Sequence, residues 1–122
     1  MDYQQKIHIL YALSDKKGTY AKFLGTSMFS VLERTQAEVV FHVFHDGTLT
    51  AENRKKLRRM VHEHGGKLKL YDVRELAKEP FAEAERIFRQ GMQDTRYTSA
   101  ALYRLVAPQV LPAEVRRLIY LD

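Results

Sequence analysis

Four short segments rich in β-branched and aromatic residues alternate along the chain with longer segments of helical period. The first, residues 7–13, is almost continuously apolar, which is typical of a central strand covered on both faces. Residues 38–44 form the second such segment, whereas residues 67–73 alternate between polar and apolar side chains and predict a strand near an edge. This alternation predicts a doubly wound α/β domain with a mainly parallel sheet of about four strands.

The segments between the first three runs predict two helices. A polar turn at residues 14–19 leads into a helix with an apolar stripe at Tyr20, Phe23, Leu24, Ser27, Met28 and Val31. A second helix follows the turn at residues 45–47, with Thr50 as its N-cap and two glycines, Gly65 and Gly66, at its end. We expect the inner face of this helix to consist of Leu57, Met60, Val61 and His64.

The pattern is weaker from residue 74 to residue 96, where a short helix is predicted at residues 83–90. A clearer helix is predicted at residues 99–109, before Pro112. The last segment, residues 116–122, predicts a buried strand that ends in Asp122.

The length and the composition of the chain limit which classes of protein it can belong to. A chain of 122 residues, of which 45% are hydrophobic, is sufficient for one domain, which we expect to extend over residues 1–122. The absence of cysteine excludes disulfides and thiolate catalysis and fits a reducing cytosol. The apolar segment near the N-terminus is too short for a signal peptide or a membrane span, so a cytoplasmic protein is expected. The net charge of +5 favours an anionic partner.

Two charged residues in apolar surroundings are candidates for chemistry. Ligands of open α/β folds bind outside the carboxyl ends of the strands, so Asp122 is placed to hold a metal ion. Arg104 is a lone cation in the apolar segment 99–107, where it needs an anionic partner because burial of an unpaired charge is costly. That partner is either a carboxylate such as Asp15 or Asp122, or the diphosphate of a ligand.

The turn at residues 14–20 opens onto a helix N-terminus, which favours anions. It lacks the glycine spacing of a Walker loop or a dinucleotide-binding loop, and the local residues favour an ordinary turn in which Asp15 caps the helix. The histidine pairs His42/His45 and His62/His64 have spacings that do not place both rings on one face of a strand or a helix, so metal binding by them is not expected.

The strongest feature for polyanion binding is the basic outer face predicted for the second helix. It consists of Arg54, Lys55, Lys56, Arg58 and Arg59. No aromatic residue interleaves with these charges to stack on bases, so nucleic acid is not expected as a partner. A solvated helix face and peripheral association with the inner face of a membrane stay open as alternatives.

Several short segments together resemble the start of the family 8 glycosyltransferases, the retaining enzymes that include bacterial lipopolysaccharide galactosyl- and glucosyltransferases and glycogenin. The resemblance rests on residues 9–15 with Tyr20 after them, 25–32, 41–47, 97–98, 103–105, 111–112 and 119–122. It therefore covers nearly the whole chain.

The resemblance implies a nucleotide-diphospho-sugar transferase fold, GT-A-like, in which the first strand and its loop hold the uridine of a UDP-sugar. The nucleotide-sugar-binding positions that it implies are Ala12, Leu13, Ser14, Asp15, Tyr20 and Arg104. Ser14 stands where many relatives carry an acidic residue that contacts the uracil. Asp122 corresponds to the first Asp of an Asp-x-Asp pair that holds Mn²⁺, or Mg²⁺, on the diphosphate. No catalytic residue is assigned.

The implied activity is metal-dependent transfer of galactose or glucose from a UDP-sugar to a saccharide or glycolipid acceptor, as in lipopolysaccharide biosynthesis. The second Asp, the acceptor-side residues and a later His ligand of such enzymes have no counterpart up to residue 122. We therefore expect a truncated N-terminal portion that does not transfer sugar by itself and that self-associates through the sheet edge beside the last strand. The alternatives are a non-catalytic nucleotide- or polyanion-binding α/β module and, less well matched, a flavodoxin-like or receiver domain.

Overall fold

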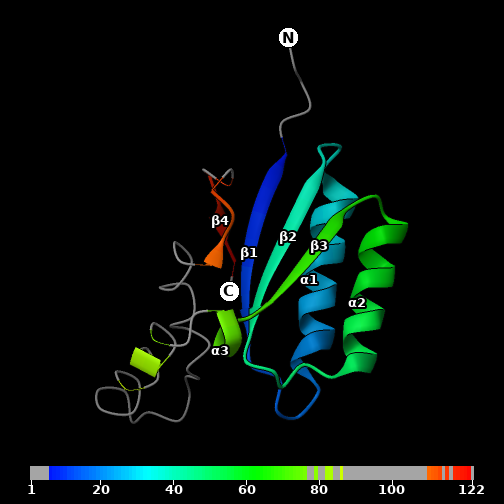
Figure 1. Ribbon diagram of the computed structural model, residues 1–122. Coiled ribbons are helices and arrows are strands. Elements are labelled where there is room, and N and C mark those ends of the chain that lie inside the picture. The colour runs from blue at the N-terminus through cyan, green and yellow to red at the C-terminus, as the bar shows by residue number, and fades with distance from the viewer. Residues whose placement is uncertain are drawn as a thin grey trace.

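The computed structural model describes residues 6–76, 79, 82–83, 86, 110–113, 115 and 117–121. Within them a four-stranded parallel sheet has the strand order β3-β2-β1-β4 (Figure 1). The strands are β1 (Ile7–Leu13), β2 (Val39–His45), β3 (Lys67–Asp72) and β4 (Ile119–Tyr120). The helices are α1 (Tyr20–Arg34), α2 (Ala51–Glu63) and α3 (Val73–Leu76).

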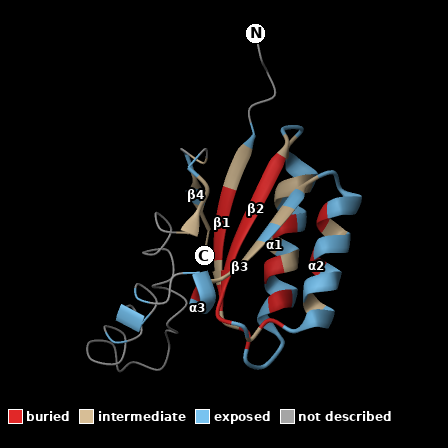
Figure 2. Ribbon diagram, viewed as in Figure 1, coloured by how far each residue is buried: buried red, intermediate tan, exposed pale blue. Residues whose placement is uncertain are grey.

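Both faces of the sheet are covered, as a doubly wound domain requires. Helices α1 and α2 lie side by side on one face (Figure 1), where they pack against alternate residues of the strands, including Ile9 and Phe41. The intervening residues Leu10 and Phe44 pack on the other face with Val73 of α3. Every residue of β2 is buried, which explains why its sequence shows no alternation (Figure 2). The predicted α/β class, the central place of β1 and the edge place of β3 are confirmed for the described strands.

Helix α1 corrects one prediction. Its buried side chains are Ala21, Leu24 and Met28, whereas Tyr20 and Phe23 are 56% and 66% exposed. At 100° per residue, Phe23 lies well to one side of the Leu24–Met28 stripe, so it flanks the core instead of entering it. The two exposed rings contact each other edge to face, with centroids 6.2 Å apart.

Helix α2 begins and ends as its sequence predicts, but one residue of its expected inner face is exposed. Leu57 and Val61 are buried, whereas His64 is the C-cap, and its ring Nδ1 contacts the Met60 carbonyl oxygen at 2.8 Å. The chain then turns through Gly65, which has a φ of +79° that side chains disfavour. His64 is therefore a helix-end residue and not a core residue.

Replacing Thr50 by alanine should lower the free energy of unfolding by about 1 kcal/mol. The Thr50 Oγ1 accepts a hydrogen bond from the Asn53 amide at 3.1 Å, and alanine leaves this first-turn N–H without that acceptor. Urea unfolding followed by circular dichroism measures the change. Thr26→Ala, which removes an exposed threonine from α1, is the matched control and should cost much less. Equal losses in the two variants would contradict the capping role.

The C-terminal part differs from its prediction. Strand β4 extends over two residues, and Ile119 is 52% exposed, so the described part of this segment is not a buried strand. It pairs with β1 through Ile9↔Ile119 and Leu10↔Tyr120. Of the helix predicted at residues 83–90, only residues 83 and 86 are described, and both are helical. The helix predicted at residues 99–109 lies outside the described residues.

No helix in the described part of the chain combines the length and the apolar character that crossing a bilayer requires.

Candidate functional site

The carboxyl ends of three parallel strands meet at one edge of the sheet. The register places Leu13 of β1 beside His45 of β2, and His45 beside Asp72 of β3. The residues that follow these strands therefore form a common rim, the place where open α/β sheets bind their ligands. We call residues 14–15, 46–48 and 72–74 the rim.

Two hydrogen bonds join the loop after β1 to the loop after β2. The Ser14 hydroxyl donates to Asp46 Oδ2 at 2.8 Å, and the Asp15 amide donates to Thr48 Oγ1 at 2.6 Å. Asp46 in turn accepts from the amide and the hydroxyl of Thr48, at 3.1 and 2.6 Å. The two loops are consequently held in one fixed arrangement by a polar network in which Asp15 and Asp46 are buried and Ser14 and Thr48 are partly exposed.

Asp15 ties the same network to helix α1. Its carboxylate is 1% exposed and accepts hydrogen bonds from the amides of Tyr20 and Ala21, at 2.8 and 3.3 Å. It thereby satisfies two of the free N–H groups of the first turn, although the residue at the N-cap position is Thr19, whose side chain makes no capping bond. The capping role considered for Asp15 from the sequence is confirmed.

The other predicted residues of this turn lie at the same place. The side chain of Leu13 is buried in the core beneath α1 and α2, so its backbone is what it offers to a ligand. Ala12 and Ser14 are partly exposed, and Tyr20 is exposed at the start of α1. These positions thus surround one polar turn with an aromatic ring beside it. Their contacts with a nucleotide stay predictions.

The β2 and β3 sides of the rim carry a buried histidine and an ion pair. His45 is 5% exposed and its Nδ1 accepts from the Gly47 amide at 3.1 Å; burial lowers its pKa, and the Asp72 carboxylate partly offsets this effect. Asp72 accepts two hydrogen bonds from the Arg74 guanidinium, at 3.2 and 3.1 Å. Burial raises the pKa of Asp72, but the pairing with Arg74 outweighs this effect and keeps the pKa below its usual value.

Glycine is favoured at position 47 by the backbone conformation of the loop after β2. Gly47 has a φ of +84°, which side chains disfavour, and a β-carbon there would also displace the Arg74 guanidinium from its present position. Arg74 can lie across the loop after β2 only because this side chain is absent.

A metal site does not form from the described part of the rim. Each of its carboxylates already accepts hydrogen bonds, and among the described residues no three His, Asp or Glu side chains converge on a point. The predicted metal ligand Asp122 and the predicted diphosphate contact Arg104 lie outside the described residues.

Sequence reasoning missed Asp46 and Thr48. The segment 45–47 was interpreted as a turn, although the same rule that selects residues after β1 applies to residues after the neighbouring strand. Application of that rule to both strands would have found them.

In the comparison with protein-family models, residues 8–122 match the model of glycosyl transferase family 8. The search of curated proteins and the search of solved structures gave no match. The matched region includes β1 from its second residue onwards, β2, β3, β4 and the whole rim. The chain therefore belongs to glycosyl transferase family 8.

Proposed function

We propose that this chain, as a member of glycosyl transferase family 8, binds a UDP-sugar at the rim and contributes the donor site of a metal-dependent hexosyltransferase. Membership of the family supports glycosyltransferase activity and implies a nucleotide-sugar donor and an acceptor. The observation that carries the donor site is the connection of the loop after β1 to the loop after β2 by Ser14–Asp46 and Asp15–Thr48. It gives the rim a fixed shape before any ligand arrives, which lowers the entropic cost of binding.

The proposed contacts follow from the position of each residue on the rim. The base and ribose lie against Ala12, the Leu13 backbone and Ser14, with the exposed ring of Tyr20 beside them. Asp15 acts through the turn that it holds, because its carboxylate is buried and engaged with α1. A ring of this kind stacks favourably on a base, by about 1–3 kcal/mol.

The diphosphate is assigned to Arg104 and to a metal ion held by Asp122. Strand β4 runs parallel to β1 with Leu10 opposite Tyr120, so the chain after Tyr120 follows a strand directed towards the rim. A planar guanidinium suits a diphosphate because it donates two parallel hydrogen bonds. Mn²⁺, or Mg²⁺, supplies a Lewis acid that neutralises the departing nucleoside diphosphate. The proposed acceptor is a saccharide or a glycolipid, and the proposed sugar is galactose or glucose.

The donor site is tested by isothermal titration of the purified chain with UDP, with and without Mn²⁺. We expect binding that Mn²⁺ strengthens by about tenfold or more, because the metal adds a direct contact to the phosphate oxygens. Asp122→Ala should remove the effect of Mn²⁺. The matched control is Glu63→Ala, which removes an exposed carboxylate from α2 and should retain it. A folded chain that gives no heat with UDP in either condition would rule out the proposed site.

A further inference from the structure

Helix α2 exposes a row of cations that the proposed donor site does not use. We call Arg54, Lys55, Arg58 and Arg59 the cationic stripe; all four are exposed (Figure 2). Among the described residues, no carboxylate lies within ion-pair distance of any of them. The neighbouring Lys56 differs, because it pairs with Glu52 at 3.3 Å. The four cations of the stripe therefore make no ion pair among the described residues, although Glu52 and Glu63 lie beside Lys55 and Arg59.

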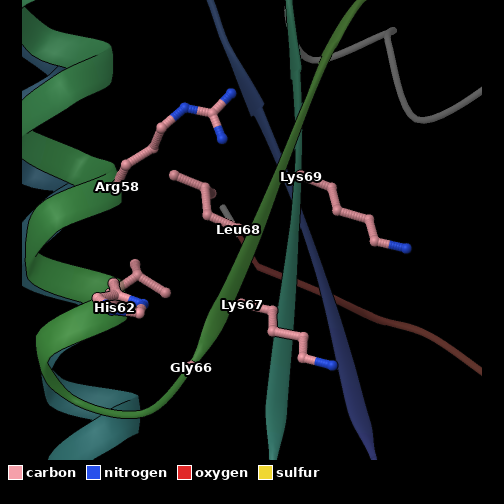
Figure 3. Close-up of a pocket in the computed structure, with 7 residues that line it drawn as sticks. Arg58, His62, Gly66, Lys67, Leu68 and Lys69 are labelled. Atoms are coloured by element: carbon pink, nitrogen blue, oxygen red, sulfur yellow. The ribbon is translucent and has the colours of Figure 1, made fainter.

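The stripe borders a hollow between α2 and the edge strand. A cavity of about 460 Å³ lies there, lined by Arg58, Val61 and His62 from α2 and by residues 66–69 at the start of β3. Figure 3 shows Arg58 extending from α2 towards β3, while Lys67 and Lys69 project from β3 on the side away from the helix. Lys67 pairs with Glu38 at 3.0 Å. Cations therefore flank the edge of the sheet on both sides of β3.

The residues of this surface suit phosphate groups better than bases. The stripe and the lining of the cavity hold no Phe, Tyr or Trp side chain, and the imidazole of His62 is their only ring, so a stacking platform for several bases of a single-stranded nucleic acid is missing from them. Arginine presents a planar fork that matches phosphate oxygens in pairs. From Arg54 to Arg59 the helix advances about 7.5 Å, so the stripe can reach more than one phosphate group on a flat surface.

We propose that the cationic stripe and the adjoining α2–β3 cavity dock the protein on an anionic phospholipid surface. Charge complementarity carries this assignment. Clusters of four or more Lys and Arg on one face of a helix bind anionic bilayers, and each such residue near the surface strengthens binding by about fivefold. A surface contact of this kind needs no apolar insertion, which agrees with the exposed face of α2 having no large apolar side chain.

The position of the stripe fixes how the molecule lies on such a surface. Arg54 is in the first turn of α2 and its charge acts on His45 at the rim, whereas Arg58 and His62 lie progressively closer to the start of β3. Helix α2 therefore runs along the strands from the rim to the opposite end of the sheet, and the stripe occupies the part of the helix nearer to the rim. Docking through it places the strands along the bilayer, and the rim opens sideways over the headgroups. That this orientation would bring the rim to a glycolipid acceptor rests on the proposed function. The docking on the bilayer does not rest on it.

The test is co-sedimentation of the purified chain with phosphatidylglycerol-containing vesicles and with pure phosphatidylcholine vesicles at low ionic strength. We expect binding to the anionic vesicles only, and roughly 30-fold weaker binding for Arg58→Gln/Arg59→Gln. The matched control is Lys22→Gln/Arg34→Gln, which removes two exposed cations from α1 and should bind nearly as tightly as the parent chain. Titration with UDP is run on each variant as an independent check, so that loss of docking and loss of the donor site are separated.

Three outcomes would overturn the proposal. The first is absence of binding to anionic vesicles, and the second is an equal loss in the α1 and α2 variants, which would mean that net charge alone drives binding. The third is tight binding of a single-stranded RNA oligonucleotide, lost in Arg58→Gln/Arg59→Gln, by a chain that ignores vesicles. That result would assign the stripe to nucleic acid.

Discussion

Replacing Asp15 by alanine is expected to lower the free energy of unfolding by about 3 kcal/mol, because it leaves two amides of α1 without an acceptor in a buried setting. The carboxylate is 1% exposed and accepts from Tyr20 and Ala21, so water cannot readily replace it. The change also weakens the turn that positions the proposed donor contacts. We therefore expect UDP binding to fall together with stability.

Urea unfolding of Asp15→Ala, Asp15→Asn and the parent chain checks this expectation. Asparagine keeps one side-chain carbonyl oxygen, so it should retain one of the two hydrogen bonds and lose about half as much stability. Glu33→Ala removes an exposed carboxylate from α1 and serves as the control for the loss of a negative charge. If Asp15→Ala were no less stable than this control, the carboxylate would not be holding the helix.

Acidification is expected to destabilise the chain by about 3 kcal/mol between pH 6.5 and pH 4, chiefly through His42. His42 is fully buried on β2, between His8 and Tyr71. Its Nε2 lies 2.9 Å from His8 Nδ1, and its Nδ1 lies 2.9 Å from the Tyr71 hydroxyl. Burial lowers its pKa to about 4, and the charges of His8 and Lys69 act in the same direction.

The sign follows from proton binding in the two states. Between these pH values the unfolded chain takes up a proton at His42, whereas the folded chain does not. The contribution of His42 to the free energy of unfolding is therefore fully present above pH 6.5, and it is lost as the pH falls to 4. Burial also lowers the pKa of His8, helped by Lys69 and Lys6, so its contribution has the same sign.

Chemical unfolding at pH 4.5, 5.5 and 7.5 measures this dependence. His42→Gln should reduce the slope, since it removes the titrating ring. Tyr71→Phe removes a hydroxyl that contacts the ring, but it keeps the histidine and should retain the slope. A full slope in His42→Gln would assign the acid sensitivity to other groups.

The sequence predicts β1, β2 and β3 well, but not β4, which was expected to be buried. Residues 39–45 are apolar apart from two histidines and form the fully buried β2, whereas the alternating residues 67–72 form the edge strand β3. The burial of His42 could not be predicted in this way. The ring of His42 can be buried because partners on β1 and β3 contact both of its nitrogens. Which residues face each other across strands depends on the register, which the sequence pattern does not reveal.

The candidate site is predicted less completely for a similar reason. The turn after β1 was found because it follows a strand and leads into a helix. Its anchoring depends on residues more than 30 positions away, Asp46 and Thr48, and on the register that brings His45 beside Leu13. Periodicity identifies which residues face inwards, but it does not show which polar side chains meet across two loops. The exposure of Phe23 was mispredicted because apolar character alone does not define the centre of a helix stripe.

The hydrogen bond from Ser14 to Asp46 restricts what the rim can accept. A hydroxyl has one hydrogen to give, and that of Ser14 is directed at Asp46 Oδ2. A ligand group that contacts the Ser14 hydroxyl therefore meets the lone pairs of its oxygen. The bond to the Asp46 carboxylate makes these lone pairs better hydrogen-bond acceptors. A neutral serine therefore presents the polarity of an acid at this position. A ring N–H can donate a hydrogen bond to the Ser14 oxygen, whereas an unprotonated ring nitrogen finds no donor there.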